Sequence, residues 1–459
     1  MARRGEAQPM PDPHPAPGSQ PTVPDPTYLN LLKADMAARA AAADPPGSAF
    51  TGAPVEATAE VRAAVDALAP QLLSLASDIY GYAELAFEEY RSAGRIAAQI
   101  EAAGIDVERG AYGLDTALCA RFGPSTGRTI GICAEYDALP NIGHACGHNV
   151  IAATGVGAFL AIARAYAGRE DELPGQVVLL GTPAEEGHTG KEYMAQAGAF
   201  EDLDAAIMLH PAGYDAADVL WIGRRLLDVE FTGVAAHASA QPFMGRNALD
   251  AASLLYQGIG LLRQQMLPID RVHAAIPEGG DRPSIITESA RVSIYVRSAE
   301  PATLMDLSQR VEDIARGAAL MTGCGVEVRW DKHPPSMPVR ANQALTGRWS
   351  VRQQERGRAP LPRGVVSDSL AASTDFGNVS YLVPGIHPML RIADAETALH
   401  TRGFAQAAAS EAAETGVLDG TYGLAGVALD YLFDDALAEA VRQEFEDAGG
   451  VLRVSEMFG

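Results

Sequence analysis

The chain has 459 residues, a length that predicts two domains rather than a single hydrophobic core. Hydrophobic residues make up 47% of the chain and charged residues 20%, as in ordinary globular proteins, and the formal net charge is −23. Because nucleic acids and acidic membrane surfaces repel so anionic a chain, we expect neither to be a partner.

The N-terminus and the cysteines indicate a cytoplasmic protein. Residues 1–4 include two arginines, but prolines and polar residues follow where a secretory signal has an apolar segment, and we expect no membrane span. The four cysteines are too sparse for a disulfide framework, which fits a reducing compartment. Three of them, Cys119, Cys133 and Cys324, lie in apolar surroundings and are predicted to be buried thiols.

The first half of the chain alternates helical and strand patterns after a proline-rich start. Residues 1–27 contain eight prolines and are predicted to be a disordered tail. Apolar spacing then predicts helices at 28–43, 61–86, 92–103 and 150–167, and strands at 116–122, 129–134, 176–180 and 205–209. This alternation predicts an α/β fold with a doubly wound mixed sheet, in which ligands bind beyond the carboxyl ends of the strands.

The pattern changes near residue 225. The sequence then predicts a strand at 227–233, a helix at 247–264, a pair of strands at 284–297, a helix at 301–321 and a strand at 325–330. This β-α-β-β-α-β order is typical of a ferredoxin-like α+β domain. Because the earlier alternation resumes near residue 340, we expect residues 226–340 to be inserted into a larger, discontinuous domain of residues 28–225 and 341–459.

The segment HACGHN, residues 144–149, places one thiol and two imidazoles between a predicted strand and a predicted helix. Gly147 allows the backbone to turn there, so that Cys146 and His148 can be presented to one point. A thiolate and an imidazole are borderline ligands of the kind that zinc binds. A Cys-x-His pair alone is nevertheless a weak indication of a metal site.

Three further predicted loops carry residues of the same kind. Glu185 and Glu186 are adjacent carboxylates, and near a cation one of them can bind metal while the other takes a proton from water. His210 and His400 each follow a short apolar run, and either one, taken singly, could be an ordinary buried histidine. Five ligand-type residues at strand or loop ends together favour a site for two metal ions.

Longer motifs around these residues resemble the M20 family of metallopeptidases and amidohydrolases. The motifs AEYDALP (134–140) and GHACGHN (143–149) are similar to its subfamily D, which includes p-aminobenzoyl-glutamate hydrolases and M20 domain-containing dipeptidases. The motifs STDFGNVS (373–380) and VPGIHP (383–388) resemble the same branch. The likeness runs from about residue 60 to residue 430.

The resemblance implies a role for each candidate residue of the larger, catalytic domain. The residues expected to bind two divalent ions, zinc or manganese, are Cys146, His148, Glu186, His210 and His400. Cys146 is placed to bridge the two ions. Glu185 is expected to be the general base, and Asp137 to orient a metal-binding histidine.

The inserted domain resembles the family's lid and dimerisation domain, which implies a homodimer. His237 matches a histidine that reaches across the dimer to the oxyanion, and Arg297 matches an arginine that binds the substrate carboxylate. The structural alternatives are that His237 is a surface loop residue and that Arg297 is a charge at the end of a strand. Asn247 resembles a further substrate-binding position, although a helix N-cap is its simpler explanation. Ser284 replaces the usual asparagine of the lid and makes fewer hydrogen bonds to substrate.

We therefore predict a metal-dependent amidohydrolase that acts on a small molecule with a free carboxylate. The expected substrates are an N-acyl amino acid, an aminobenzoyl-glutamate or a dipeptide, whose amide is attacked by water activated by the metals and Glu185. A true dipeptidase that requires a free substrate amine is the alternative, and the sequence does not separate the two. An inactive binding protein is disfavoured because neither a ligand nor the base is missing.

Overall fold

The computed structural model describes residues 21–458, so the first 20 residues of the predicted disordered tail lie outside it. Residues 21–42 form a separate unit, in which the one helix of the described residues is α1 (Thr27–Ala42). The other helices and strands are α2 (Val55–Tyr82), α3 (Tyr90–Ala102), β1 (Val107–Arg109), β2 (Leu118–Phe122), β3 (Arg128–Ala134), α4 (His148–Ala165), β4 (Gly175–Gly181), α5 (Gly190–Gln196), β5 (Ala205–Ile207), β6 (His210–Ala212), β7 (Gly223–Thr232), α6 (Ala248–Leu262), β8 (Arg271–Glu278), β9 (Ser289–Ser298), α7 (Pro301–Thr322), β10 (Gly325–Trp330), α8 (Gln343–Gln354), α9 (Phe376–Ser380), β11 (Gly385–Ile386), β12 (Met389–Arg391), α10 (Arg402–Ala407), α11 (Glu411–Phe433), α12 (Asp435–Asp447) and α13 (Val454–Phe458).

The main sheet has six strands in the order β1-β2-β4-β3-β5-β11. Strands β4, β3, β5 and β11 are parallel, whereas β2 pairs antiparallel with both β4 and β1. Along β4, Val177 and Leu179 belong to one hydrophobic core and Val178 and Leu180 to another, because successive side chains point to opposite faces. The sheet is therefore buried on both faces, and the prediction of an α/β fold with a mixed sheet is confirmed.

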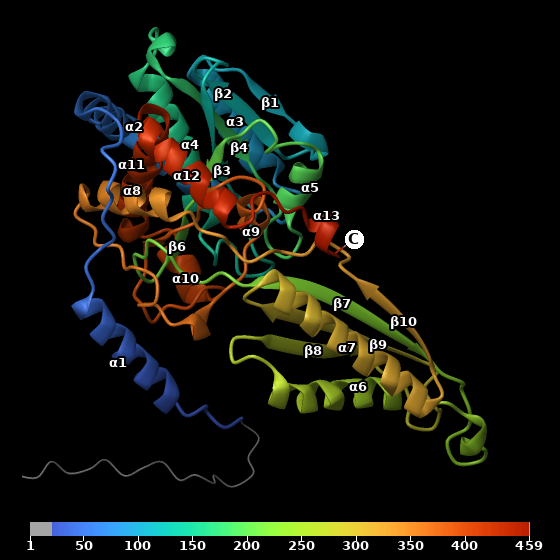
Figure 1. Cartoon of the computed structure of the whole chain (residues 1–459). Helices are drawn as coiled ribbons and strands as arrows, with labels where there is room; N and C mark the ends of the chain where they lie inside the picture. Colours follow the sequence, from blue (N-terminus) through green and yellow to red (C-terminus); the bar gives the residue numbers. More distant parts are fainter. Residues whose placement is uncertain (1–20, 459) are drawn as a thin grey trace, which may run out of the picture. The chain divides into compact units, whose positions relative to one another are not determined.

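Helices cover both faces of this sheet (Figure 1). On one face α2, α4 and α11 pack together through a core that includes Leu72, Val156 and Leu424. On the other face α5 and α9 contribute Met194 and Phe376 to the second core. The helix α4 follows β3 through the loop of residues 135–147, so it begins at the carboxyl end of a central strand. Such strand ends are where ligands bind in open α/β sheets.

The helix α4 is unusually apolar. Among the described residues it is the one helix long and apolar enough, by length and composition alone, to cross a membrane. Of its 18 residues, 89% are buried inside the fold. It is so apolar because the sheet and two neighbouring helices surround it, as in the core helix of a globular protein.

A second sheet has four antiparallel strands in the order β10-β7-β9-β8. Helices α6 and α7 pack on one of its faces, around a hydrophobic core separate from those of the main sheet (Figure 1). The chain order of these elements is β-α-β-β-α-β, from Gly223 to Trp330.

Three local predictions were wrong. Residues 284–287 were predicted to be a strand because of two adjacent isoleucines, yet Ile285 is 52% exposed and makes only an isolated bridge to His237. The strand that pairs with β9 is instead β8. Because β8 lies at the sheet edge and most of its side chains are exposed, its sequence does not alternate between apolar and polar residues. The helix α2 begins at Val55 rather than at residue 61, directly after Pro54. Cys324 is half-buried rather than buried.

Candidate metal centre

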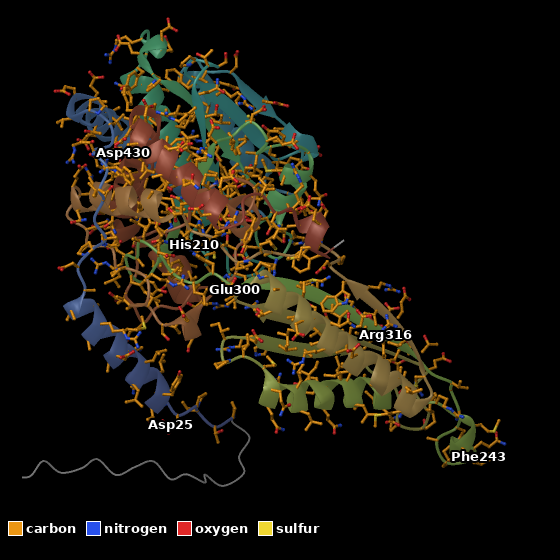
Figure 2. The ribbon with its side chains drawn as sticks, in the orientation of Figure 1. Asp25, His210, Phe243, Glu300, Arg316 and Asp430 are labelled. Carbon is orange, nitrogen blue, oxygen red and sulfur yellow. The ribbon has the colours of Figure 1, made fainter. Side chains whose placement is uncertain are left out.

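Six of the predicted site residues lie together beyond the carboxyl ends of the main strands. They come from the loop before α4 and its first residue (Cys146, His148), the loop after β4 (Glu185, Glu186), the start of β6 (His210, labelled in Figure 2) and the loop before α10 (His400). The turn into α4 requires glycine at position 147. Gly147 has φ +80°, and a Cβ added there would lie 3.0 Å from a ring carbon of Pro211.

The distances between the ligand-type atoms are those of a coordination shell. Cys146 Sγ lies 3.4 Å from His210 Nε2 and 3.4 Å from His400 Nε2. His400 Nε2 lies 3.5 Å from Glu186 Oε1. Because zinc binds sulfur, nitrogen and oxygen at about 2.0–2.3 Å, the ligand atoms of a tetrahedral site are about 3.3–3.6 Å apart.

Three overlapping groups of side chains could each hold a metal ion. Their members, within 4.8 Å of one another in each group, are Cys146 with His148 and His210, Cys146 with Glu186 and His400, and His148 with Glu185 and Glu186. The first two groups share Cys146, so its thiolate would be a ligand common to both ions if each group held one. Cys146, His148 and His210 are buried.

The polar atoms of the centre also fit a cation. His148 Nε2 and Glu186 Oε1 are buried, and neither has a hydrogen-bond partner among the described residues. Most buried polar atoms in proteins have one. Both atoms can donate an electron pair, and both face the same ligand group. A metal ion would accept these electron pairs, whereas a further hydrogen-bond acceptor would not.

Hydrogen bonds fix which nitrogen of each histidine faces the centre. The Nδ1–H of His148 donates to Asp137 Oδ1 at 3.0 Å, and the Nδ1–H of His210 donates to the carbonyl of Pro211 at 2.7 Å. In both rings Nε2 is therefore the nitrogen that faces the ligand groups. The backbone N–H of Glu186 donates to Asp137 Oδ2 at 2.8 Å, so this one carboxylate positions both a histidine and a glutamate.

Burial and mutual charge shift the pKa values of these groups. Burial, followed by His148, lowers the pKa of His210 to about 3, which keeps the imidazole neutral. Burial and the neighbouring Glu135 and Glu186 raise the pKa of Glu185 well above that of an ordinary carboxyl. Although burial alone would raise the pKa of Asp137, His148 and the Glu186 N–H hold it below its usual value. Two adjacent glutamates and one aspartate therefore have very different proton affinities.

The four predicted lid residues lie outside the three ligand groups. His237 is exposed, and its Nδ1 accepts hydrogen bonds from the backbone N–H groups of Ser239 and Ala240 at 3.3 and 3.2 Å. The remaining Nε2–H is therefore the free donor of this ring. The carbonyl of Ser284 accepts a hydrogen bond from the N–H of Ala238 at 3.0 Å, which places Ser284 beside the His237 loop.

The other two lid residues lie within regular elements. Asn247 precedes α6, and its side-chain oxygen accepts the N–H of Leu249 at 3.1 Å, as an N-cap does. Arg297 lies in β9 and is half-buried.

Sequence reasoning missed a buried ion network beside His148. Lys191 Nζ donates to Glu135 Oε1 and, at 2.7 Å, to Asp375 Oδ1, and all three residues are buried. Glu135 Oε2 lies 3.5 Å from His148 Nε2 and has no hydrogen-bond partner among the described residues. The sequence did offer a signal for Glu135, because it lies two residues before Asp137 in the same motif. Nothing in the sequence around Lys191 indicates that it belongs to this network.

Comparisons with known proteins show the family to which the chain belongs. Residues 131–401 match the family model described as Peptidase family M20/M25/M40. The chain is 39% identical to a Xaa-Arg dipeptidase from Mus musculus, with 83% of this chain and 90% of the relative covered. It is 29% identical to one of the p-aminobenzoyl-glutamate hydrolase chains from Escherichia coli (strain K12), with 83% and 93% covered. Its fold is similar to a dinuclear metal-binding peptidase of the M20 family from Bacillus subtilis, with a TM-score of 0.60, 20% identity, and 80% and 99% covered.

Proposed function

Because the chain belongs to the peptidase family M20/M25/M40, we propose that it is a metal-dependent amidohydrolase of small carboxylate-bearing substrates. It cleaves the amide bond of an N-acyl amino acid, an aminobenzoyl-glutamate or a dipeptide. The observation that carries the proposal is the pair of ligand groups that share Cys146. The named activities of the two curated relatives, a dipeptidase and an aminobenzoyl-glutamate hydrolase, support the same class of reaction.

We assign each of the two groups to one divalent ion. Cys146, His148 and His210 would hold the first ion, and Cys146, Glu186 and His400 the second. Thiolate and imidazole ligands suit zinc, and the carboxylate is also compatible with manganese. The solved relative with a dinuclear metal site supports this stoichiometry. Bound ions would polarise the scissile carbonyl and lower the pKa of a bound water.

Glu185 is the proposed general base. It belongs to neither group that shares Cys146, yet its Oε2 lies 4.0 Å from His148 Nε2, at the edge of the centre. The raised pKa of this carboxyl, caused by burial and by Glu135, suits a group that takes a proton from water and delivers it to the leaving nitrogen. Asp137 is a positioning residue, since it holds His148 and the backbone of Glu186.

We propose that residues 226–340 are the lid and dimerisation domain of a homodimer, inserted into a catalytic domain of residues 28–225 and 341–459. The separate core of the four-stranded sheet supports this division. The exposed His237, with its free Nε2–H, suits a donor to the oxyanion of the partner's site. Arg297, Ser284 and Asn247 are the proposed substrate contacts of the lid. The absence of disulfides at all four cysteines supports a cytoplasmic location.

A dipeptidase is the second candidate, and the Xaa-Arg dipeptidase at 39% identity favours it. The two candidates differ at the acyl side of the amide, where a dipeptidase binds a free ammonium group. Turnover of a dipeptide and of its N-acetylated form separates them directly. A dipeptidase cleaves only the first, whereas an acylase accepts an N-acyl amino acid that has no amine.

The proposal is tested by metal analysis and turnover of the same sample. Protein purified without chelator should contain about two equivalents of divalent metal per chain, by ligand count, and should hydrolyse members of a panel of N-acyl amino acids and dipeptides. Cys146→Ser should lower the content of both ions because it belongs to both groups. A fully loaded protein that hydrolyses no member of the panel would overturn the proposed activity.

A further inference from the structure

Three arginines lie side by side across the four-stranded sheet. Arg224 of β7 is paired with Arg297 of β9, and Arg297 is paired with Arg271 of β8. Directly opposite residues on neighbouring strands point to the same face of a sheet. Val296 and Val272, their neighbours along the strands, belong to the core beneath α6 and α7. The arginine row, Arg224, Arg297 and Arg271, is therefore on the face that these helices do not cover.

The arginine row has no acidic partner among residues 21–458. Arg224 Nη2 donates to the hydroxyls of Thr189 and Ser336 at 3.3 and 3.4 Å, and Arg271 Nη1 donates to backbone carbonyls only. The Nε of Arg297 is buried without any hydrogen-bond partner among the same residues.

Other arginines of the same sheet do have acidic partners. Arg291, on the same face of β9, is paired with Glu278 at 3.0 Å, and Arg329 of β10 is paired with Glu230 at 2.8 Å. Acidic side chains therefore partner the arginines farther along the sheet, but not the arginine row.

Like charges placed opposite one another destabilise a sheet. Burial, followed by the charge of the neighbouring Arg224, lowers the pKa of Arg297 below that of an ordinary guanidinium. The ring of Tyr295 lies 5.5 Å from the guanidinium carbon of Arg224 and 5.4 Å from that of Arg297, and so supports both groups from one side. The row is thus held in place without an ion pair to any carboxylate among the described residues.

One end of the row is attached to the metal-site loop. Thr189, which accepts the hydrogen bond from Arg224, lies in the same loop as Glu185 and Glu186, three residues after Glu186. The loop is held further by the Nδ1–H of His188, which donates to the carbonyl of Glu186 at 2.8 Å. Arg224 therefore joins the open face of the sheet to the segment that carries the proposed base.

We propose that the arginine row selects substrates whose released amino acid is acidic, such as an N-acyl glutamate or N-acyl aspartate. This inference rests on the proposed amidohydrolase function and adds the substrate class. Arg297, in the middle of the row, binds the α-carboxylate, and Arg224, its neighbour on the side of the metal-site loop, binds the side-chain carboxylate. Arg271 flanks Arg297 on the other side and adds to the positive charge of the row. Neighbouring strands are about 4.8 Å apart, a spacing that suits two carboxylates separated by a few carbon–carbon bonds. Planar guanidinium groups bind carboxylates through paired hydrogen bonds.

The same charges disfavour a basic amino acid. An arginine or lysine side chain placed beside the row would meet two or three uncompensated guanidinium groups. The chain should therefore differ in specificity from the Xaa-Arg dipeptidase that it resembles in sequence.

The test compares N-acetyl-glutamate with N-acetyl-glutamine, which differ only in the side-chain charge, and with N-acetyl-arginine. The metal-loaded protein should prefer glutamate over glutamine by about 10- to 100-fold in kcat/KM, the range expected for hydrogen bonds to a charged group. Arg224→Gln should reduce this preference by about tenfold or more, mainly through a higher KM for glutamate. Arg224→Glu should shift the preference toward N-acetyl-arginine.

Arg291→Gln is the matched control, because Arg291 lies on the same face of the same strand as Arg297 but is already paired with Glu278. It should leave the glutamate-to-glutamine ratio unchanged. A ratio near one in the unaltered protein, with turnover of both substrates, would overturn the inference while preserving the proposed function. So would an equal loss on both substrates in Arg224→Gln, which would give Arg224 a structural role only. If Arg224→Gln does not fold, Arg271→Gln should lower the ratio by the same argument.

Discussion

Replacing Lys191 by methionine should cost about 3–5 kcal/mol of unfolding free energy at neutral pH, the usual cost of breaking a buried ion pair from one side. Lys191 is fully buried, and its Nζ binds the carboxylates of Glu135 and Asp375. Methionine has a similar length and volume, so the loss would come from charge rather than from a cavity. Two buried carboxylates would remain without a cation.

The pH dependence of this loss identifies its cause. Burial already raises the pKa of Glu135, and removing the Lys191 charge beside it should raise this pKa further, with each pH unit of increase worth about 1.4 kcal/mol. A carboxyl whose pKa is raised in the folded state costs no stability at pH values below its pKa in the unfolded chain, about 4. The loss of unfolding free energy then increases as pH rises toward the pKa of the folded state. The difference between the variant and the unaltered protein should therefore be smallest near pH 4 and largest at neutral pH.

Urea unfolding followed by circular dichroism, on protein freed of metal by chelation, measures this difference at several pH values. Lys332→Met is the matched control, because Lys332 is not buried and its removal should change the unfolding free energy by less than about 0.5 kcal/mol. A loss in Lys191→Met below about 1 kcal/mol, or one that is the same at pH 5 and pH 7, would refute the argument that Lys191 compensates two buried charges.

Three further predictions concern the metal centre and the lid. Glu185→Gln should retain both ions and lose about two orders of magnitude or more in kcat, as expected for loss of a general base. Burial and the nearby Asp137 raise the pKa of Glu89 to about 7, so the stability contributed by this carboxyl is lost as pH rises from about 4.5 to 7. We compare the unfolding free energy of the metal-free protein with that of its Glu89→Gln variant. The difference should fall by about 3 kcal/mol over this pH range. Mixing Glu185→Gln with His237→Ala chains should restore some activity if His237 serves the partner's site.

Each of these predictions has a clear opposing result. Activity in Glu185→Gln together with a metal-loaded but inactive Glu186→Gln would reverse the roles assigned to the two residues. Parallel stability curves for Glu89→Gln and the unaltered protein would show that Glu89 does not titrate in this range. A lack of recovery in the mixed sample, once exchange between dimers has been demonstrated by differently tagged chains, would show that His237 does not act across a dimer.

The sequence predicted the central strands and the meeting of the ligand-type side chains because one topological rule governs both. Strands β3 and β4 are apolar on both faces and are joined through the buried helix α4, so a parallel arrangement followed from composition alone. The carboxyl ends of parallel strands share one edge of the sheet. This edge brings Cys146 and Glu186 together although they belong to separate sequence motifs.

The remaining features depend on contacts that no local pattern encodes. Strand β8 is an edge strand with mostly exposed side chains, so it lacks the alternation that identified β9. Lys191 reaches carboxylates 56 and 184 residues away in sequence, and a lone lysine in a short helix predicts neither. The arginine row is likewise created by strand register, since its three members become neighbours only when β7, β9 and β8 are paired.

The metal centre and the arginine row have opposite electrostatic requirements. The centre concentrates thiol and carboxyl groups that need cations, whereas the row concentrates guanidinium groups that need anions. The loop from Glu185 to Thr189 contacts both, so a substrate with an amide at the centre and carboxylates at the row would satisfy both ends of that loop. Interactions made far from the reacting bond can position it for attack. Under the proposed specificity, removing the side-chain carboxylate should therefore raise KM and, to a smaller extent, lower kcat, because its binding to Arg224 also helps to hold Glu185 in place.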